Sequence, residues 1–316
     1  MEEKVNFMSE GCKIVALVFY PDNYQKGMRF PALVFDGPMT GLKDQVVSVY
    51  ARKLAKKGYL CLTFDHRFYG ESEGEPRQFE SPIKKIEDIQ NAVSYLLSRS
   101  DVDSEKVGAV GICAGGGHMA RAITGLKSIK AFAGIDACYH DPKTMIRWLG
   151  QAGYDAAIER SRKAEEKYRK TGEVEYIPAV SSDPGNMNVA MPTEEPFEYY
   201  GTLRGYSPHY VNRFAVMGYE GFITFNAIDS AKDIRVPTAV IHGTHDMFCT
   251  PQNAKQFYNS LRSLKEFFCI ETTNHIDLYD KERYVDQAVE EAAHWFNRYL
   301  LSKIEEPFMP RVKVAA

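Results

Sequence analysis

Short apolar runs alternate with amphipathic segments over most of the chain, and this alternation limits the fold more than any other feature. The pattern is typical of a mostly parallel sheet with helices on both faces, and it predicts an α/β fold. The expected strands are residues 13–20, 31–36, 59–65, 107–112, 130–136, 238–243 and 265–271. The expected helices are residues 44–58, 81–99 and 280–304, the last of them capped by Asp280.

The alternation is interrupted between about residue 139 and residue 230. This segment contains a charged helical stretch, AAIERSRKAEEKYRK, and then a stretch punctuated by Pro and Gly. From Phe197 to Phe225, nine of 29 positions are Phe or Tyr, whereas 12% of the whole chain is aromatic. We interpret residues 139–230 as an inserted lid domain, with residues 1–138 and 231–316 as the core. Most of these aromatic side chains are expected to pack within the lid itself.

The overall charge and hydropathy exclude two classes of partner. A formal net charge of −3 over 316 residues gives no global attraction to nucleic acid. No apolar run approaches the ~18 residues that a membrane helix needs. The acidic start lacks the apolar core of a signal peptide, so we expect a cytoplasmic protein without a membrane partner.

The six cysteines include no C-x-x-C pair, which argues against a zinc site and against a disulfide scaffold. Cys61 and Cys269 lie inside apolar strand-like runs and are expected to be buried. No histidine and carboxylate cluster has ligand spacing, and no phosphate loop ends in G-K-[ST]. Neither a metal nor an organic cofactor is therefore expected.

The stretch VGAVGICAGGGHMA, residues 107–120, combines an expected strand, the pattern G-x-C-x-G and an expected helix start. This is the arrangement of a nucleophile elbow, whose sharp turn lifts the nucleophile above the sheet. Gly111, Gly115 and Gly116 supply the small residues that a close approach of strand and helix needs. The N-terminus of the following helix favours a thiolate at Cys113. The alternative is a glycine-rich turn with an incidental thiol. The presence of a base and an acid for Cys113 distinguishes the two interpretations.

A cysteine nucleophile needs a base, and the base needs an orienting carboxylate. In an elbow fold the order along the chain is nucleophile, acid, histidine. Asp246 follows one expected strand and His275 follows the next, both at the sheet edge where active-site loops gather. We therefore predict a triad of Cys113, His275 and Asp246, with Asp277 and Asp280 as alternatives for the acid.

An acyl-transfer site also needs donors for the developing oxyanion. The backbone N–H of Ala114 directly follows the nucleophile. The second donor is expected in the loop after residues 31–36, where Met39 is the candidate because Pro38 has no N–H. The candidate substrate-binding residues are Tyr69, His118, Trp148, Tyr200 and Phe222.

With elbow, acid and histidine in this order, the chain resembles α/β-hydrolase-fold proteins along nearly its whole length. The Cys in GICAGG is similar to that of dienelactone hydrolases, which use a Cys-His-Asp triad. The stretches DGPMTGLKDQ, DHRFYGESEG, FNAIDSAKDIRVPTAVIHGTHD and NHIDLYD resemble more closely a dienelactone-hydrolase-like subgroup that includes fungal polyketide transferases. This resemblance implies the same triad of Cys113, His275 and Asp246. The chain departs from it at Asp36-Gly37, where His-Gly is common, and in a longer lid, which favours a larger acyl chain.

The expected activity is acyl transfer through an acyl-Cys113 intermediate, formed from a polyketide-type ester or thioester. Transesterification or Claisen-type carbon–carbon condensation would follow, because an aromatic lid that excludes water lets other acceptors compete with hydrolysis. An ester, lactone or thioester hydrolase is the first alternative, and a non-catalytic ligand-binding member of the fold is the second. The expected partner is a small-molecule acyl substrate, delivered as a carrier-protein or coenzyme A thioester. A homodimer is left open.

Overall fold

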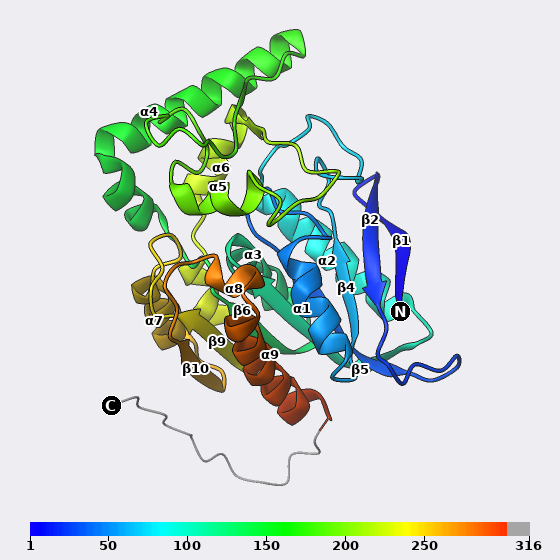
Figure 1. Ribbon diagram of the computed structural model, residues 1–316. Helices are drawn as coiled ribbons and strands as arrows, with labels where there is room; N and C mark the ends of the chain where they lie inside the picture. Colours follow the sequence, from blue (N-terminus) through cyan, green and yellow to red (C-terminus); the bar gives the residue numbers. More distant parts are fainter. Residues whose placement is uncertain (302–316) are drawn as a thin grey trace.

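The computed structural model describes residues 1–301, and the centre of this part of the chain is one sheet of eight strands (Figure 1). The order across the sheet is β1-β2-β4-β3-β5-β6-β9-β10. β2 pairs antiparallel with β1 and β4, and the other neighbours pair in parallel. The strands are β1 (Glu2–Ser9), β2 (Cys12–Phe19), β3 (Phe30–Asp36), β4 (Leu60–Phe64), β5 (Val102–Ile112), β6 (Ile129–Ile135), β9 (Thr238–Gly243) and β10 (Lys265–Ile270). All seven expected strands are present, and the predicted α/β class is confirmed.

β1 is the strand of this sheet that the sequence pattern did not predict. It lies at the sheet edge, and its first residues, Glu2, Glu3 and Lys4, are exposed. The segment therefore lacks the apolar run that marks the other strands. Backbone pairing with β2 holds it instead, in a register that sets Glu2 opposite Phe19 and Ser9 opposite Cys12.

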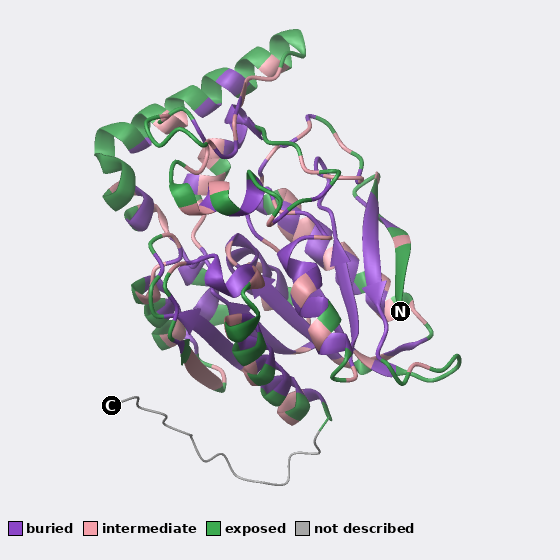
Figure 2. Ribbon diagram, viewed as in Figure 1, coloured by how far each residue is buried: buried purple, intermediate pink, exposed green. Residues whose placement is uncertain are grey.

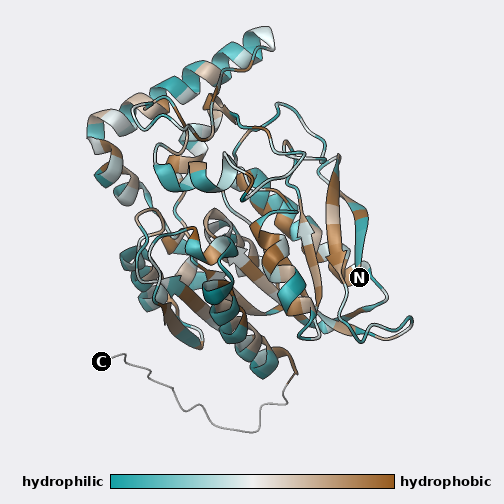
Figure 3. Ribbon diagram, viewed as in Figure 1, coloured by the Kyte–Doolittle hydropathy of each residue, from teal (hydrophilic) through white to brown (hydrophobic). Residues whose placement is uncertain are grey.

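Helices cover both faces of the sheet, and each face has its own apolar core (Figures 1 and 2). The core helices are α1 (Val46–Ala55), α2 (Pro82–Ser98), α3 (Ala114–Ala122), α7 (Pro251–Ser260), α8 (Asp277–Asp280) and α9 (Glu282–Phe296). On β3, Ala32 and Val34 join the cluster under α2, α3 and α7, whereas Leu33 and Phe35 join the cluster under α1 and α9. A strand buried on both faces requires this alternation. Figure 3 shows the same division, with apolar strands inside and hydrophilic outer helix faces.

Between β6 and β9 the chain runs through the segment predicted to be a lid. Its elements are α4 (Pro142–Thr171), β7 (Tyr176–Ile177), α5 (Glu194–Tyr200), β8 (Phe214–Ala215), η2 (Val216–Gly218), α6 (Tyr219–Thr224) and η3 (Ile228–Asp233). Figure 1 shows α4, α5 and α6 together at one end of the sheet. α4 is kinked at Gly150, and its second half is joined to η2 where Ser161 Oγ donates to the Met217 carbonyl at 2.9 Å. None of the described helices combines the length and apolar character that crossing a bilayer needs.

A helix occupies most of the expected range 280–304, but the expectation that Asp280 caps it is wrong. α8 ends at Asp280, and α9 begins at Glu282 with Lys281 as its N-terminal flanking residue. Asp280 does not cap α9, because its carboxylate accepts two hydrogen bonds from Arg204 at 2.7 Å each. The helical structure continues from α9 into a π-helical turn at Asn297–Leu301, and residues 302–304 lie outside the described part of the chain.

The expected burial of Cys269 is also wrong, whereas Cys61 is buried as expected. Both residues lie in strands, but β4 is in the interior of the sheet and β10 is at its edge. An edge strand has a neighbour on one side alone, so Cys269 remains exposed although the run around it is apolar.

Candidate active site

Cys113 is the single residue between β5 and α3, and its backbone is held in a strained conformation. Its φ of 53° and ψ of −127° lie outside the regions that residues with a side chain ordinarily adopt. The glycines around it are required by contact. A Cβ at Gly111 would lie 2.6 Å from the Gly116 Cα, and a Cβ at Gly115 would lie 2.5 Å from the Asp36 carbonyl carbon. Strand and helix approach closely here, which is the local geometry of a nucleophile elbow.

The structure brings the three predicted side chains Cys113, His275 and Asp246 together. His275 follows β10 and Asp246 follows β9, so both side chains reach the elbow from the carboxyl edge of the sheet. His275 Nδ1 lies 2.7 Å from Asp246 Oδ2, and both residues are buried. The sulfur atoms of Cys113 and Cys249 and a ring nitrogen of His275 all lie within 4.8 Å of one another. The alternative acids are engaged elsewhere, Asp277 by Thr273 and Asp280 by Arg204.

A second carboxylate, that of Asp136, lies against the same nitrogen of His275 at 2.9 Å. Asp136 directly follows β6 and has a positive φ of 44°, which turns its side chain toward the neighbouring strand ends. It also accepts the Gly243 backbone N–H at 3.1 Å. The sequence analysis did not select it, although it closes an expected strand at the same sheet edge as Asp246. The strand-end argument that identified Asp246 was sufficient to find it.

The two carboxylates differ in their electrostatics. Burial and the charge of Asp246 raise the pKa of Asp136. Burial also opposes ionisation of Asp246, but the His275 imidazolium outweighs it and lowers the pKa of Asp246. His275 is buried as well, yet the charges of Asp246, Cys113 and Asp136 raise its pKa well above its ordinary value. The site therefore favours a charged imidazole, one firmly ionised carboxylate and one carboxyl that retains its proton to higher pH.

Cys249 lies beside the elbow cysteine and was not identified from the sequence. Its Sγ is 3.8 Å from Cys113 Sγ and 4.0 Å from His275 Nε2. A hydrogen bond from the Cys249 thiol, followed by the charge of His275, lowers the pKa of Cys113 well below its ordinary value, although burial opposes this. Burial and the neighbouring sulfurs raise the pKa of Cys249 itself. Cys113 is therefore the thiolate of the pair, and Cys249 is the donor.

Two tyrosine hydroxyls complete the surroundings of the thiolate. Tyr279, which lies on α8 four residues after His275, has its hydroxyl 3.0 Å from His275 Nε2 and within hydrogen-bond reach of Cys113. Burial, and then the Cys113 charge, raise the pKa of Tyr279 well above its ordinary value, so the hydroxyl stays a donor. The Tyr200 hydroxyl is also buried, and burial, followed by the charges of Tyr199 and Cys113, raises its pKa well above its ordinary value.

The two expected oxyanion donors lie in the cluster that contains Cys113. Ala114 and Met39 are both buried there, and their backbone N–H groups make no hydrogen bond within the described residues. The Met39 loop is held by Asp36, whose carboxylate accepts the Gly37 N–H and the His66 ring at 2.7 Å each. Asp36 therefore stabilises the loop, and the backbone N–H groups of Met39 and Ala114 stay available to a ligand.

The five candidate substrate-binding residues lie in different surroundings. Phe222 belongs to the same cluster as Cys113, Met39 and Ala114, and Tyr200 is described above. The Tyr69 hydroxyl donates a hydrogen bond to the Glu80 carboxylate at 2.9 Å, and the buried His118 ring lies 3.4 Å from the Asp36 carboxylate. Trp148 is 45% exposed on the first half of α4. Phe222 and Tyr200 therefore share the surroundings of Cys113, whereas Tyr69 and His118 contact the residues that hold the Met39 loop.

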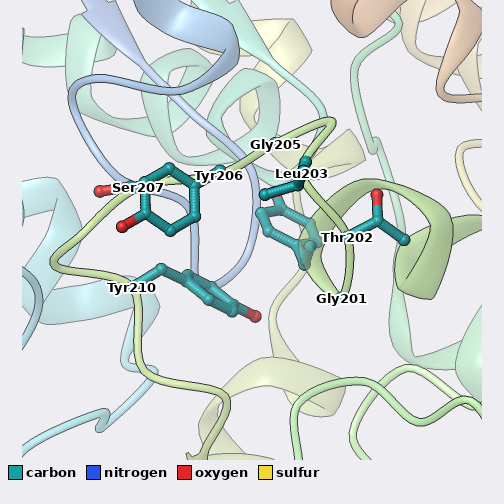
Figure 4. Close-up of a pocket in the computed structure, with 8 residues that line it drawn as sticks. Gly201, Thr202, Leu203, Gly205, Tyr206, Ser207 and Tyr210 are labelled. Atoms are coloured by element: carbon teal, nitrogen blue, oxygen red, sulfur yellow. The ribbon is translucent and has the colours of Figure 1, made fainter.

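A pocket of about 380 Å³ opens beside this site, on the segment that follows α5 (Figure 4). It is lined by Tyr200, Gly201, Thr202, Leu203, Gly205, Tyr206, Ser207 and Tyr210. The rings of Tyr200 and Tyr210 stack with centroids 5.2 Å apart, and the Tyr210 hydroxyl lies 3.5 Å from Thr40 Oγ1 beside Met39. Tyr200 thus belongs both to the pocket and to the surroundings of the Cys113 sulfur.

Within residues 1–301, two groups of side chains offer metal-ligand atoms within 4.8 Å of one another. These are Cys113, Cys249 and His275, and Asp136, Asp246 and His275. Sequence spacing did not indicate them because their members come from different strand ends. The donor atoms in each group are already hydrogen-bonded or ion-paired to one another, which is an arrangement suited to proton transfer.

Comparisons with known proteins agree with this architecture. A family model described as alpha/beta hydrolase fold matches residues 41–282, which is more than half of the chain. The chain belongs to the alpha/beta hydrolase fold family. This hydrolase-fold chain is 30% identical to the uncharacterized protein YcjY of Escherichia coli strain K12, over 95% of its own length and 100% of the relative. A crystal structure of hypothetical protein PA2218 from Pseudomonas aeruginosa matches with a TM-score of 0.83 at 26% identity, covering 95% and 94% of the two chains.

One of the fungal relatives is named an acyltransferase. The chain is 21% identical to this protein, acyltransferase drtE of Aspergillus calidoustus, over 86% of the chain and 88% of the relative. The resemblance to the hydrolase fold and to fungal enzymes of this class, which the sequence motifs indicated, is confirmed.

Proposed function

We propose that this alpha/beta hydrolase is an acyl-transfer enzyme that uses Cys113 as its nucleophile, His275 as its base and Asp246 as the orienting acid. The observation that carries the proposal is a thiolate with a lowered pKa on a strained elbow, close to an imidazole that a carboxylate holds at 2.7 Å. A nucleophile, a base and an orienting group in this relation are the general signature of covalent acyl catalysis.

The chemistry follows from the positions of the groups. The Cys113 thiolate attacks the carbonyl carbon of a bound ester or thioester, and the free N–H groups of Ala114 and Met39 stabilise the oxyanion. The intermediate collapses when His275 gives its proton to the leaving alcohol or thiol. This leaves an acyl-Cys113 thioester. His275 then accepts a proton from the acceptor as the acceptor attacks the acyl carbon, and a second collapse releases the product and the Cys113 thiolate.

The surroundings of Cys113 favour acceptors other than water. Phe222 and Met39 belong to the apolar cluster at the nucleophile, and the rings of Tyr200 and Tyr279, on which the Cys113 charge acts, are buried. A site that excludes bulk water gives a bound alcohol or carbon nucleophile time to react with the acyl thioester. The acceptor reaction we propose is transesterification or Claisen-type condensation, with hydrolysis as side or reverse chemistry.

The substrate class that we propose is a polyketide-type acyl group, carried as an ester or as a coenzyme A or carrier-protein thioester. The pocket beside Tyr200 has room for part of such a chain, since ligand pockets of this kind begin at about 300 Å³. Its lining of aromatic and small polar side chains is suited to an acyl chain that carries ketone and hydroxyl groups. The similarity to a protein named acyltransferase supports this class.

The test is intact-protein mass spectrometry after exposure to acyl and β-ketoacyl thioesters, with small-molecule products followed in the presence and absence of a second acyl acceptor. We expect a mass gain equal to the acyl group and a transferred or condensed product when the acceptor is present. Cys113→Ala should abolish the gain, and Cys269→Ala, which removes an exposed thiol, should keep it.

Each other result has a definite meaning. A Cys113-dependent mass gain that yields free acid with every acceptor would replace transfer by hydrolysis. The absence of an adduct with every donor, in a protein whose Cys113 also resists thiol reagents, would favour a non-catalytic ligand-binding member of the fold.

A further inference from the structure

The proposed acyl transfer uses Cys249 as a hydrogen-bond donor to Cys113. It gives no other role to the close approach of the two sulfur atoms. Their sulfur atoms are 3.8 Å apart, and those of a disulfide are about 2.05 Å apart, so a small movement of one side chain would join them. Cys113 is half-buried and Cys249 is 1% exposed, which means that an oxidant reaches Cys113 first. A reactive thiol with a protected thiol directly behind it is the arrangement of a redox-sensitive cysteine and its resolving partner.

We propose that Cys113 is a site of reversible oxidation by hydroperoxides, and that Cys249 resolves the oxidised form as a Cys113–Cys249 disulfide. The proposal requires a reactive thiolate at Cys113 but no acyl transfer, so it stands or falls separately from the proposed function. Its consequence is an enzyme that is switched off by peroxide and restored by a thiol reductant.

The first step oxidises the thiolate. The Cys113 sulfur attacks one oxygen of the hydroperoxide and gains that oxygen as a sulfenic acid, while the O–O bond breaks and the peroxide is reduced. The departing hydroxide or alkoxide takes a proton from the His275 imidazolium and leaves as water or alcohol.

The second step forms the disulfide. The Cys249 sulfur attacks the Cys113 sulfur, the S–O bond breaks, and the hydroxyl group leaves as water with the proton that Cys249 loses. His275 Nε2 lies 4.0 Å from Cys249 Sγ and accepts this proton on its way to the leaving hydroxide. The buried Cys249 thiol has a raised pKa, so it needs such a base to react.

Cys138 is the other cysteine of this cluster, and it is the natural competitor. The Cys249 thiol, followed by His140, lowers the pKa of Cys138 to about 6. However, its sulfur already contacts His140 Nδ1 at 3.6 Å, and the residue is buried, whereas Cys113 is partly exposed. We assign the disulfide to Cys113 because oxidation starts at the accessible thiolate.

Disulfide formation would also act on the triad acid. The backbone N–H groups of Phe248 and Cys249 both donate to Asp246 Oδ1, at 2.8 and 2.7 Å. A movement of Cys249 toward Cys113 therefore pulls on the turn that holds the carboxylate of Asp246. The oxidised state blocks the nucleophile and loosens its acid at the same time.

The test treats the full chain with a small excess of hydrogen peroxide, blocks free thiols with an alkylating reagent, and maps peptides without reduction. We expect a cross-linked pair containing Cys113 and Cys249, lighter than the two peptides by two hydrogens and released by dithiothreitol. In Cys249→Ser we expect the cross-link to be lost and Cys113 to gain two oxygens, which dithiothreitol does not remove. The matched control Cys138→Ser should keep the Cys113–Cys249 cross-link.

Two results would overturn the proposal: a Cys138–Cys249 cross-link in the oxidised wild type, or over-oxidation of Cys113 at the same rate in wild type and Cys249→Ser. Peptide mapping of the wild type decides the matter by itself if a variant fails to fold. A cross-link without an acyl adduct in the thioester assay would retain this inference and remove the proposed function. An acyl adduct without the cross-link would do the reverse.

Discussion

The carboxylates of Asp136 and Asp246 lie against the same ring nitrogen of His275, at 2.9 and 2.7 Å. They come from the ends of two different strands, β6 and β9, which are neighbours in the sheet. The imidazole N–H can donate fully to one carboxylate at a time. The shorter contact and the lowered pKa of Asp246 support our proposal that it is the working partner, and the raised pKa of Asp136 leads us to propose that carboxyl as a reserve.

The first prediction is that Asp136 replaces Asp246 when the latter is neutralised. Removal of the Asp246 charge lowers the pKa of Asp136, because this charge is a main cause of the raised value. In Asp246→Asn we expect the acylation rate to fall by about 10- to 100-fold, less than the ~10⁴-fold seen where a triad has a single acid. Asp136→Asn should cost less than about 10-fold, and the double variant should lose the full ~10⁴-fold.

The measurement is the single-turnover rate of acylation for the two single variants and the double variant, each checked for folding by circular dichroism. Equal rates in Asp246→Asn and in the double variant would show that Asp136 does not act as a reserve. A loss in Asp136→Asn as large as that in Asp246→Asn would show that the two carboxylates work together.

The second prediction concerns the pH dependence of Cys113 alkylation. A thiolate forms as the pH rises through the thiol pKa, so a lowered pKa keeps Cys113 reactive at pH values well below the ordinary thiol pKa of about 8.5. Cys249→Ala removes the hydrogen bond that is the largest cause of the shift. The rise in alkylation rate by iodoacetamide should therefore move to higher pH in this variant.

The control is Cys269→Ala, whose profile for Cys113 should match that of the wild type because Cys269 is exposed and is not among the groups that shift the pKa of Cys113. Profiles that coincide for Cys249→Ala and the wild type would contradict a hydrogen bond from Cys249 to the thiolate.

Much of the site could be predicted because its residues follow the ends of recognisable strands. Cys113, Asp246 and His275 are each within a few residues of an apolar run, and parallel strands gather their carboxyl ends at one edge. Cys249 could not be found in this way, because its position depends on a turn that wraps around the Asp246 carboxylate. Tyr279 carried a weak signal, since it is four residues after His275, a spacing that brings two side chains together wherever the chain is helical.

The errors in the fold have a common physical origin. The capping argument for Asp280 considered local sequence alone, and a distant arginine, Arg204, binds that carboxylate instead. The burial expected for Cys269 followed from an apolar run, but the position of β10 at the sheet edge decided its exposure. β1 was missed because an edge strand held by backbone pairing needs few apolar residues. Each case depends on which segment becomes a neighbour in space.

The third prediction is that Glu80 stabilises the loop that carries Met39. Glu80 is fully buried, pairs with buried Lys85, and accepts the Tyr69 hydroxyl and the Thr40 backbone N–H, at 2.9 and 3.3 Å. Glu80→Gln leaves the Lys85 charge without its partner, so we expect the free energy of unfolding to fall by about 3–5 kcal/mol. The second variant, Glu80→Gln combined with Lys85→Met, should recover part of this loss.

The pH dependence of this pair has a defined sign. Burial opposes ionisation of Glu80, but the Lys85 charge outweighs it and lowers the pKa of the folded state. The stabilisation is therefore complete above the unfolded pKa of about 4.3, and it is lost as the pH falls toward the lower folded value. Urea unfolding at pH 7 and below pH 4 would check this, and an equal difference between wild type and Glu80→Gln at both pH values would contradict it.

The fourth prediction is that Phe222 controls the balance between transfer and hydrolysis. Its ring belongs to the apolar cluster that contains Cys113, Met39 and Ala114, so its removal opens the acyl-enzyme to water. In Phe222→Ala we expect the fraction of free acid to rise several-fold, while the rate of acylation changes much less. The reason is that acylation depends on the thiolate and the oxyanion donors, whereas partition depends on which acceptor reaches the thioester.

The partition is measured as the ratio of free acid to transferred product at a fixed acceptor concentration. Met187→Ala is the matched control, because Met187 belongs to the same inserted segment but is 76% exposed, and its ratio should equal that of the wild type. If acylation and partition fell together in Phe222→Ala, the ring would be positioning the donor substrate. If neither changed, water would already reach the acyl-enzyme past Phe222, and the preference for other acceptors would have to come from side chains other than Phe222.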